Sequence, residues 1–275
     1  MDVTLADERI LILPTRFSME QAEGRAWAKR IDAFGAVAKL SGFLNRPKDE
    51  EFEVTYREHR LQPFWRIGCT ATYEYERARD YRVPVEPKVT SVAFDGRDLA
   101  VEAGHFTLSG TEHCREEITR DTYFDAVTGT ADAGLAAYLK DEPAEADAAA
   151  LAKATEDGAV VVPPAAKASA LVRDVLAGAI TRIDADTVLK EQLEFHHVDL
   201  IYRPVYAFRY RWLGKEAVVE FDGVRGNTRS GGDTFEQFMG KTIDAQFLLN
   251  AGVEAAGLFI PGARLAEIVI TKIGR

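Results

Sequence analysis

The chain has 275 residues, of which 47% are hydrophobic and 28% are charged, and its formal net charge is −10. That length suits two domains of common size or one large one, and the apolar share is ordinary for a globular protein. The negative charge argues against a general nucleic-acid binder, because phosphate contacts need a basic surface.

The first predicted elements are a strand and a helix. The apolar run from Ile10 to Leu13 meets Pro14, and a helical pattern starts at Ser18. Ser18 and Gln21 have the spacing of a capping box, which predicts the start of the helix. Apolar side chains then recur at helical spacing and predict a buried stripe: Ala22, Ala26, Trp27, Ile31 and Phe34.

A long strand is predicted after Pro63. From Trp65 to Tyr75 apolar and polar side chains alternate, which is typical of a half-buried strand. A hairpin at Ala78-Arg79-Asp80 and a return strand over residues 81–85 are expected to follow.

The same order of features recurs farther along. The stretch from Ala131 to Thr155, rich in alanine and acidic residues, predicts a short helix, a break and a second helix that join two similar halves. Beyond it, Val160 to Val162 meets two prolines, a helical pattern follows, and an aromatic strand comes after Pro204. Counted from the prolines, Tyr206 stands where Trp65 does. A repeat this long predicts a duplicated domain, because solenoid repeats are shorter.

These patterns predict an α+β fold of two tandem related units, each a helix packed on an antiparallel sheet, with a helical C-terminal tail. The expected bounds are 1–130 for the first unit, 131–157 for an acidic helical linker, 158–232 for the second unit and 233–275 for the tail. The strand of the second unit is expected to turn at Leu213-Gly214-Lys215.

Two closing turns carry a resemblance to a known group of domains. They are Phe124-Asp125-Ala126-Val127-Thr128-Gly129 and Phe221-Asp222-Gly223-Val224-Arg225-Gly226. With the segment from Tyr202 to Phe208, they resemble the PepSY and cystatin-like group of small α+β modules, here in two copies. The resemblance implies a non-catalytic binding or regulatory role, which is common in that group.

The tail after Ser230-Gly231-Gly232 is strongly apolar. A helix is predicted from near Thr242, Pro261-Gly262 would break it, and a short helix would follow. The tail is expected to cover a sheet face, to mediate self-association or partner docking, or to lie on a membrane, and the last use is disfavoured because it has few Lys or Arg residues. The residues predicted to make its contacts are Phe247, Leu248, Leu258, Phe259, Leu265 and Ile268.

One strand of the second unit is basic. Arg203, Arg209 and Arg211 share a face opposite the aromatic side chains. Arginines on an exposed sheet face can hold carboxylates or phosphates through paired hydrogen bonds. The alternative is that they pair across strands with acids such as Glu216 and Glu220.

No motif in the chain predicts a reaction. The adjacent His196 and His197 are expected to point to opposite faces of a strand, and His113-Cys114 lacks the repeated ligand spacing of a zinc site. We therefore predict no catalytic residue, no metal site and no cofactor.

The sequence favours a non-enzymatic protein that engages a protein partner or itself through the tail. One alternative is a hydrolase or metal-dependent enzyme with a site between the halves, and another is a binder of an anionic ligand at the basic strand. The absence of a signal-peptide pattern and of an uncharged apolar run of about 18 residues predicts a cytoplasmic protein that does not span a membrane.

Overall fold

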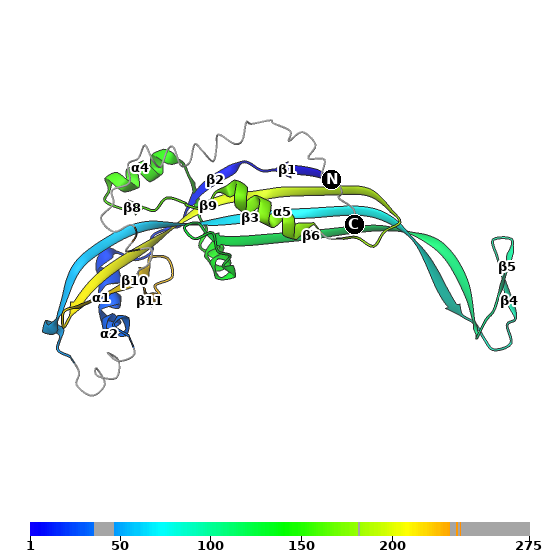
Figure 1. The fold of residues 1–275 in the computed structure, drawn as a ribbon, viewed down its shortest axis with the longest axis horizontal. Coiled ribbons are helices and arrows are strands. Elements are labelled where there is room, and N and C mark those ends of the chain that lie inside the picture. The colour runs from blue at the N-terminus through cyan, green and yellow to red at the C-terminus, as the bar shows by residue number, and fades with distance from the viewer. Residues whose placement is uncertain (36–46, 181, 232–234, 236, 238–275) are drawn as a thin grey trace.

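The computed structural model describes residues 1–35, 47–180 and 182–231, together with Phe235 and Gln237. Within these residues nine strands form one mixed sheet, and a two-stranded hairpin stands apart from it. Three strands dominate the sheet: β3 (Phe52–Pro84), β6 (His105–Asp125) and β9 (Thr187–Trp212). At a rise of about 3.3 Å per residue a straight strand as long as β3 would reach about 110 Å, and the molecule is correspondingly elongated (Figure 1).

The shorter strands are arranged around this central trio. They are β1 (Asp2–Leu5), β2 (Glu8–Ile12), β4 (Ser91–Phe94), β5 (Arg97–Ala100), β7 (Ala144–Ala146), β8 (Val160–Val161), β10 (Lys215–Asp222) and β11 (Thr228–Ser230). β3 lies antiparallel to β9 and β6 and parallel to β8. β9 also pairs with β10, β1 and β2, while β7 joins β2 and β11 joins β10. The β4–β5 hairpin lies beyond the far end of the long β3–β6 ribbon (Figure 1).

Helices cover parts of this sheet. They are α1 (Met19–Ala28), α2 (Arg30–Ala33), η1 (Asp49–Glu51), η2 (Ala133–Asp141), α4 (Ala148–Glu156) and α5 (Ala168–Ala179). The predicted capping box at the start of α1 is confirmed: the Gln21 N–H donates to Ser18 Oγ at 3.3 Å, and the Ser18 N–H donates to Gln21 Oε1 at 3.0 Å. Among the described helices, none is long and apolar enough to cross a membrane.

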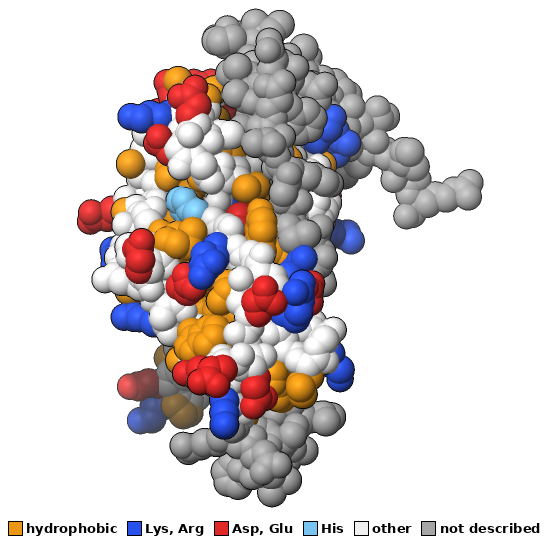
Figure 2. Space-filling view, turned by 90° about the vertical axis from the view of Figure 1, so that its left-hand side faces the viewer, with side chains coloured by type: hydrophobic (Ala, Val, Ile, Leu, Met, Phe, Trp, Pro, Cys, Tyr) orange, Lys and Arg blue, Asp and Glu red, His pale blue; other side chains and the backbone are white. Residues whose placement is uncertain are grey.

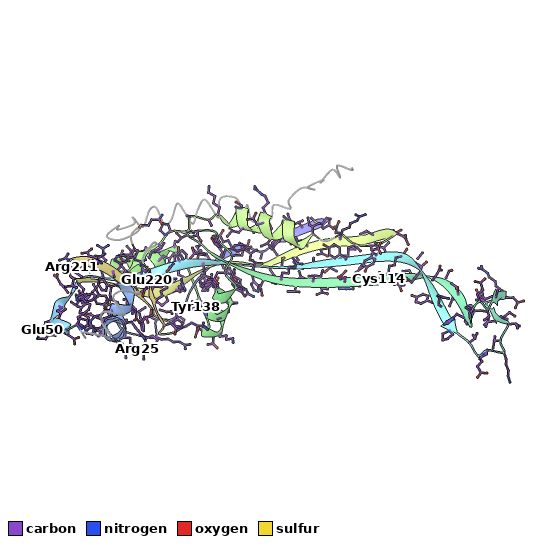
Figure 3. The ribbon with its side chains drawn as sticks, turned by 60° about the horizontal axis from the view of Figure 1, so that its bottom comes forward. Arg25, Glu50, Cys114, Tyr138, Arg211 and Glu220 are labelled. Atoms are coloured by element: carbon purple, nitrogen blue, oxygen red, sulfur yellow. The ribbon has the colours of Figure 1, made fainter. Side chains whose placement is uncertain are left out.

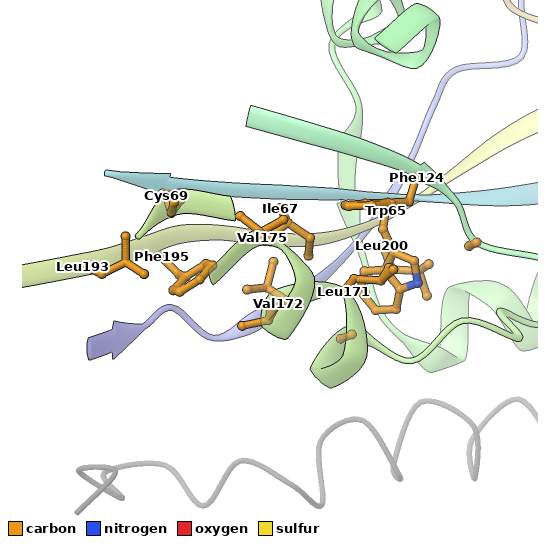
Figure 4. Packing of buried hydrophobic residues seen from close by; sticks show 14 of the residues in the cluster. Trp65, Ile67, Cys69, Phe124, Leu171, Val172, Val175, Leu193, Phe195 and Leu200 are labelled. Carbon is orange, nitrogen blue, oxygen red and sulfur yellow. The ribbon is translucent and has the colours of Figure 1, made fainter. Parts of the chain in front are cut away.

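The main core lies between α5 and the central strands. Trp65, Ile67 and Cys69 point from β3 toward Val172 and Val175 of α5 (Figure 4). The alternation predicted for this strand is therefore confirmed. A second cluster packs α1 on β9 and β10: Ala22, Ala26, Tyr206, Phe208, Tyr210, Val219 and Phe221.

The predicted fold of two tandem helix-on-sheet units is wrong. β3 and β9 pair with each other from Phe52 opposite Trp212 to Glu76 opposite Thr187, so both halves of the chain belong to one mixed sheet. Each half also places its first strand beside the long strand of the other half, β2 on β9 and β8 on β3. The expected hairpin at Ala78-Arg79-Asp80 is wrong too, because β3 continues through it and returns as β6. Apart from Phe235 and Gln237, the expected tail lies outside the described residues.

Pro63 and Pro204 explain why the predicted fold differs from the observed one. Each is expected to precede a strand, but both lie inside the long strands β3 and β9. Pro63 is opposite Tyr202 on β9, and on its other side its carbonyl accepts the Ala126 N–H at 3.3 Å. Its missing N–H faces the gap between the end of β8 and the end of β6, so the ladder loses no hydrogen bond there. Pro204 repeats the arrangement, since its carbonyl accepts the Gly223 N–H at 2.9 Å.

The turns that lie next to Pro63 and Pro204 contain equivalent hydrogen bonds. Asp125 Oδ1 accepts two successive backbone N–H groups of its turn at 2.9 Å, and Asp222 Oδ1 does the same in the second turn. In register, Phe64 lies opposite Asp125 and Val205 lies opposite Asp222. This correspondence allows the two halves to be compared residue by residue, although they are not separate units.

Candidate functional site

A pocket of about 190 Å³ lies beside η2, on the face of the sheet opposite α5. Side chains alternate between the two faces along β3, so Phe64 lies on the face of the pocket and its neighbour Trp65 lies on the face of α5. Figure 3 shows Tyr138 of η2 and Glu220 of β10 in this part of the molecule. The pocket is lined by Tyr138, Arg203, Val205, Glu220, Asp222, Asn227, Thr228 and Arg229.

The pocket forms where the two halves of the chain differ. Register places Val205 where the first half has Phe64, and Glu220 where it has Tyr123. Phe64 and Tyr123 are buried and pack with η2 in an apolar cluster. The shorter Val205 and the narrower, polar Glu220 leave space in the second half, and Arg203 borders that space.

Arg203 lines this pocket and, among the described residues, makes one hydrogen bond at its edge. Its Nη1 donates to the Tyr138 hydroxyl at 2.9 Å, and its guanidinium carbon lies 5.3 Å from the centroid of the Tyr138 ring. Its Nε is buried and makes no hydrogen bond within the described part of the chain. A guanidinium carries five N–H donors, so the single hydrogen bond to Tyr138 leaves Nη donors of Arg203 for a ligand.

Asp222, an acidic residue of the lining, is already engaged. Its Oδ1 accepts the N–H groups of Val224 and Arg225 at 2.9 Å each, and its Oδ2 accepts the Tyr138 hydroxyl. Burial raises the pKa of Tyr138, so this hydroxyl keeps its proton and remains a donor. Asp222 therefore has little capacity left for a ligand cation.

Glu220, the other acidic residue, belongs to a buried ionic network. The carboxylate accepts a hydrogen bond from Arg229 Nε and lies 3.7 Å from Arg60 Nη1. Arg60 is fully buried, and its Nε donates to Glu58 at 2.8 Å. Ala207 lies between Glu58 and Glu220 in the register, and its small side chain lets Arg60 reach across β9. The acidic charge of Glu220 is thus compensated from two sides.

The other two predicted arginines lie on the same face but outside this pocket. Arg209 Nη1 is 3.5 Å from Glu216, and the guanidinium carbon lies 5.1 Å from the ring centroid of Phe235. Arg211 donates to Glu53 and to Glu216 at 3.0 Å each. Both therefore make the kind of cross-strand ion pair considered as the alternative. Figure 2 shows that acidic and basic side chains are interspersed at this end of the molecule.

The sequence pattern does not single out Tyr138, Asp222 or Arg229 as site residues. Tyr138 comes from the stretch expected to be a linker, and its contact with Arg203 spans 65 positions. Asp222 is visible in the sequence as part of a closing turn. An alignment of that turn with the turn at Asp125 would have indicated the site. In this alignment Glu220 takes the position that Tyr123 has in the first half.

A second buried charge lies farther along the same face. Asp199 is fully buried, accepts a hydrogen bond from Arg9 Nε at 2.8 Å and lies 3.4 Å from His197 Nδ1. Burial lowers the pKa of His197. The His196 and His197 rings lie 4.9 Å apart at a register shift of β9, so the expectation that they point to opposite faces is wrong. Within the described ranges, no group of three potential metal ligands occurs.

Comparisons with protein-family models, with curated proteins and with solved structures find no match for this chain. The resemblance to the PepSY and cystatin-like group therefore stays a prediction. The residues predicted to make contacts in the apolar tail lie outside the described residues: Phe247, Leu248, Leu258, Phe259, Leu265 and Ile268.

Proposed function

We propose that the protein is a non-enzymatic binding protein that holds a small anionic ligand in the pocket beside Arg203. The supporting observation is the guanidinium of Arg203, which lines the pocket and makes one hydrogen bond, to Tyr138, among the described residues. A carboxylate or phosphate oxygen would accept hydrogen bonds from its remaining Nη donors, and charge-assisted hydrogen bonds are stronger than neutral ones. The hydrogen bond to Tyr138 holds the guanidinium in place, so less side-chain freedom is lost on binding.

The composition of the lining favours binding over catalysis. The residues that line the pocket include no histidine, cysteine or serine, and both carboxylates are engaged by donors. A general base needs a free acceptor within reach of the proton it removes. Self-association or docking of a partner through the apolar tail stays a prediction beside this proposal.

Calorimetric titration of the full chain with propionate, glutarate and inorganic phosphate tests the proposal. We expect at least one anion to bind with one-to-one stoichiometry. Arg203→Gln should weaken that binding by about tenfold or more, because a hydrogen bond to a charged group contributes about 1.5–3 kcal/mol. Arg211→Gln is the matched control, since Arg211 lies on the same strand and face but outside the pocket. The proposal fails if none of the three anions binds, or if the two variants weaken binding equally.

A further inference from the structure

Two guanidinium groups border the pocket, and each is connected with a different acidic residue of β10. Arg229 Nε donates to Glu220, whereas Arg203 reaches Asp222 through the Tyr138 hydroxyl. Glu220 and Asp222 are two residues apart on one face of β10, which corresponds to about 7 Å. The two guanidinium groups are therefore held beside different carboxylates of β10.

Both arginines keep donors available for a ligand. Arg229 has 55% of its side chain exposed, and Glu220 is its partner among the described residues. A guanidinium carries five N–H donors, so one hydrogen bond through Nε leaves the Nη groups of Arg229 available. Arg203 uses Nη1 for the Tyr138 hydroxyl, so its other Nη group provides donors at the second position.

The space around these donors is small and partly apolar. Val205 contributes an aliphatic side chain to the lining, and Asn227 and Thr228 contribute neutral polar groups. The pocket has a volume of about 190 Å³. A short chain with a charged group at each end fits this space.

We infer that the ligand is a short dianion, with one anionic group on Arg203 and the other on Arg229, and with its apolar carbons against Val205. This inference rests on the proposed function and names the class of ligand. A monoanion bound at Arg203 would leave the donors of Arg229 unused.

Titration of the full chain with succinate, glutarate and adipate, each compared with propionate at constant ionic strength, tests the inference. The best dicarboxylate should bind about tenfold more tightly than propionate, because it gains the charged hydrogen bonds at Arg229. Arg229→Gln should remove this advantage, so that the affinity for the best dicarboxylate falls more than the affinity for propionate does. The glutamine amide can still donate to Glu220, and the melting temperature of the variant checks that the fold is kept. Arg229→Lys, which keeps the charge but not the planar donors, should give an intermediate affinity.

The outcomes separate this inference from the proposed function. If propionate binds as tightly as every dicarboxylate, the dianion is wrong, while anion binding at Arg203 stands. The same conclusion follows if a folded Arg229→Gln variant loses no affinity for the best dicarboxylate, or loses equal affinity for both kinds of ligand. If no carboxylate and no phosphate binds, the proposed function itself is wrong.

Discussion

Trp65 and Tyr206 make the same contact in the two halves of the chain. The Trp65 indole N–H donates to the Ala166 carbonyl at 3.0 Å, and the Tyr206 hydroxyl donates to the Phe17 carbonyl at 2.6 Å. Each carbonyl lies two residues before the start of a helix, α5 in one case and α1 in the other. Each aromatic side chain therefore connects the segment before a helix to the sheet that the helix covers. The two residues are equivalent when the halves are aligned on Pro63 and Pro204.

Removing the Tyr206 hydroxyl should weaken the attachment of α1. We expect Tyr206→Phe to lower the free energy of unfolding by about 1 kcal/mol, because the Phe17 carbonyl loses its donor at a part-buried position. Urea unfolding with an unchanged slope measures this loss. Tyr81→Phe, at an exposed site on the β3–β6 ribbon, should change stability by less than about 0.5 kcal/mol. Equal losses in the two variants would contradict the assigned role.

The stability of the protein should depend on the protonation of Glu8. Its Oε2 is buried and makes no hydrogen bond within the described residues, and burial raises the pKa of Glu8 from 4.5 to about 7. Protonated Glu8 therefore stabilises the folded state fully below pH 4.5, and this contribution is lost as the pH rises through 7.

Glu8→Gln tests this dependence, because glutamine stays neutral at every pH. The variant should gain stability over the natural chain as the pH rises from about 5 to about 8, by on the order of 1–3 kcal/mol. Urea unfolding of both proteins across this range provides the difference, in which the other titrating groups cancel. A difference that stays constant with pH would show that Glu8 titrates normally in the folded protein.

The buried network at Arg60 should be strongly sensitive to loss of its cation. We expect Arg60→Met to lower the free energy of unfolding by about 3–5 kcal/mol, because the carboxylates of Glu58 and Glu220 then stay buried without their shared partner. Arg211→Met should cost less than about 1 kcal/mol, since its ion pairs are exposed to solvent. Denaturant unfolding compares the two variants, and a similar small loss in both would mean that Arg60 contributes no more than a surface charge.

The pocket should close when the first-half residue is restored at position 205. Val205→Phe places the ring of Phe64 at its equivalent position in the second half, so we expect anion binding to fall below detection. Val205→Ile adds a single methylene group and is the matched control, with affinity kept within about threefold. Calorimetry measures both, and a Val205→Phe variant that binds like the control would place the ligand elsewhere.

Local patterns in the sequence determined a definite part of this fold. The capping box at Ser18, the alternation beyond Trp65 and the turn at Leu213-Gly214 are all present in the structure. Each depends on residues that are close in the chain: a hydrogen bond across three positions, the two-residue period of a strand, or positive φ values at adjacent residues. Arg203 could likewise be placed on the basic face of its strand by counting from Pro204.

Only the tertiary structure decided which strands are neighbours and where the pocket lies. The sequence predicts that a strand begins after Pro63, because proline has no N–H to donate. In the structure Pro63 lies in the middle of β3, at the gap between β8 and β6 where no N–H is needed. The same holds for the site, since Tyr138 and Arg229 line the pocket beside Arg203 but come from elements that the local patterns do not connect with it. Periodicity specifies which face a side chain occupies, whereas the contacts across that face depend on pairing between segments far apart in the chain.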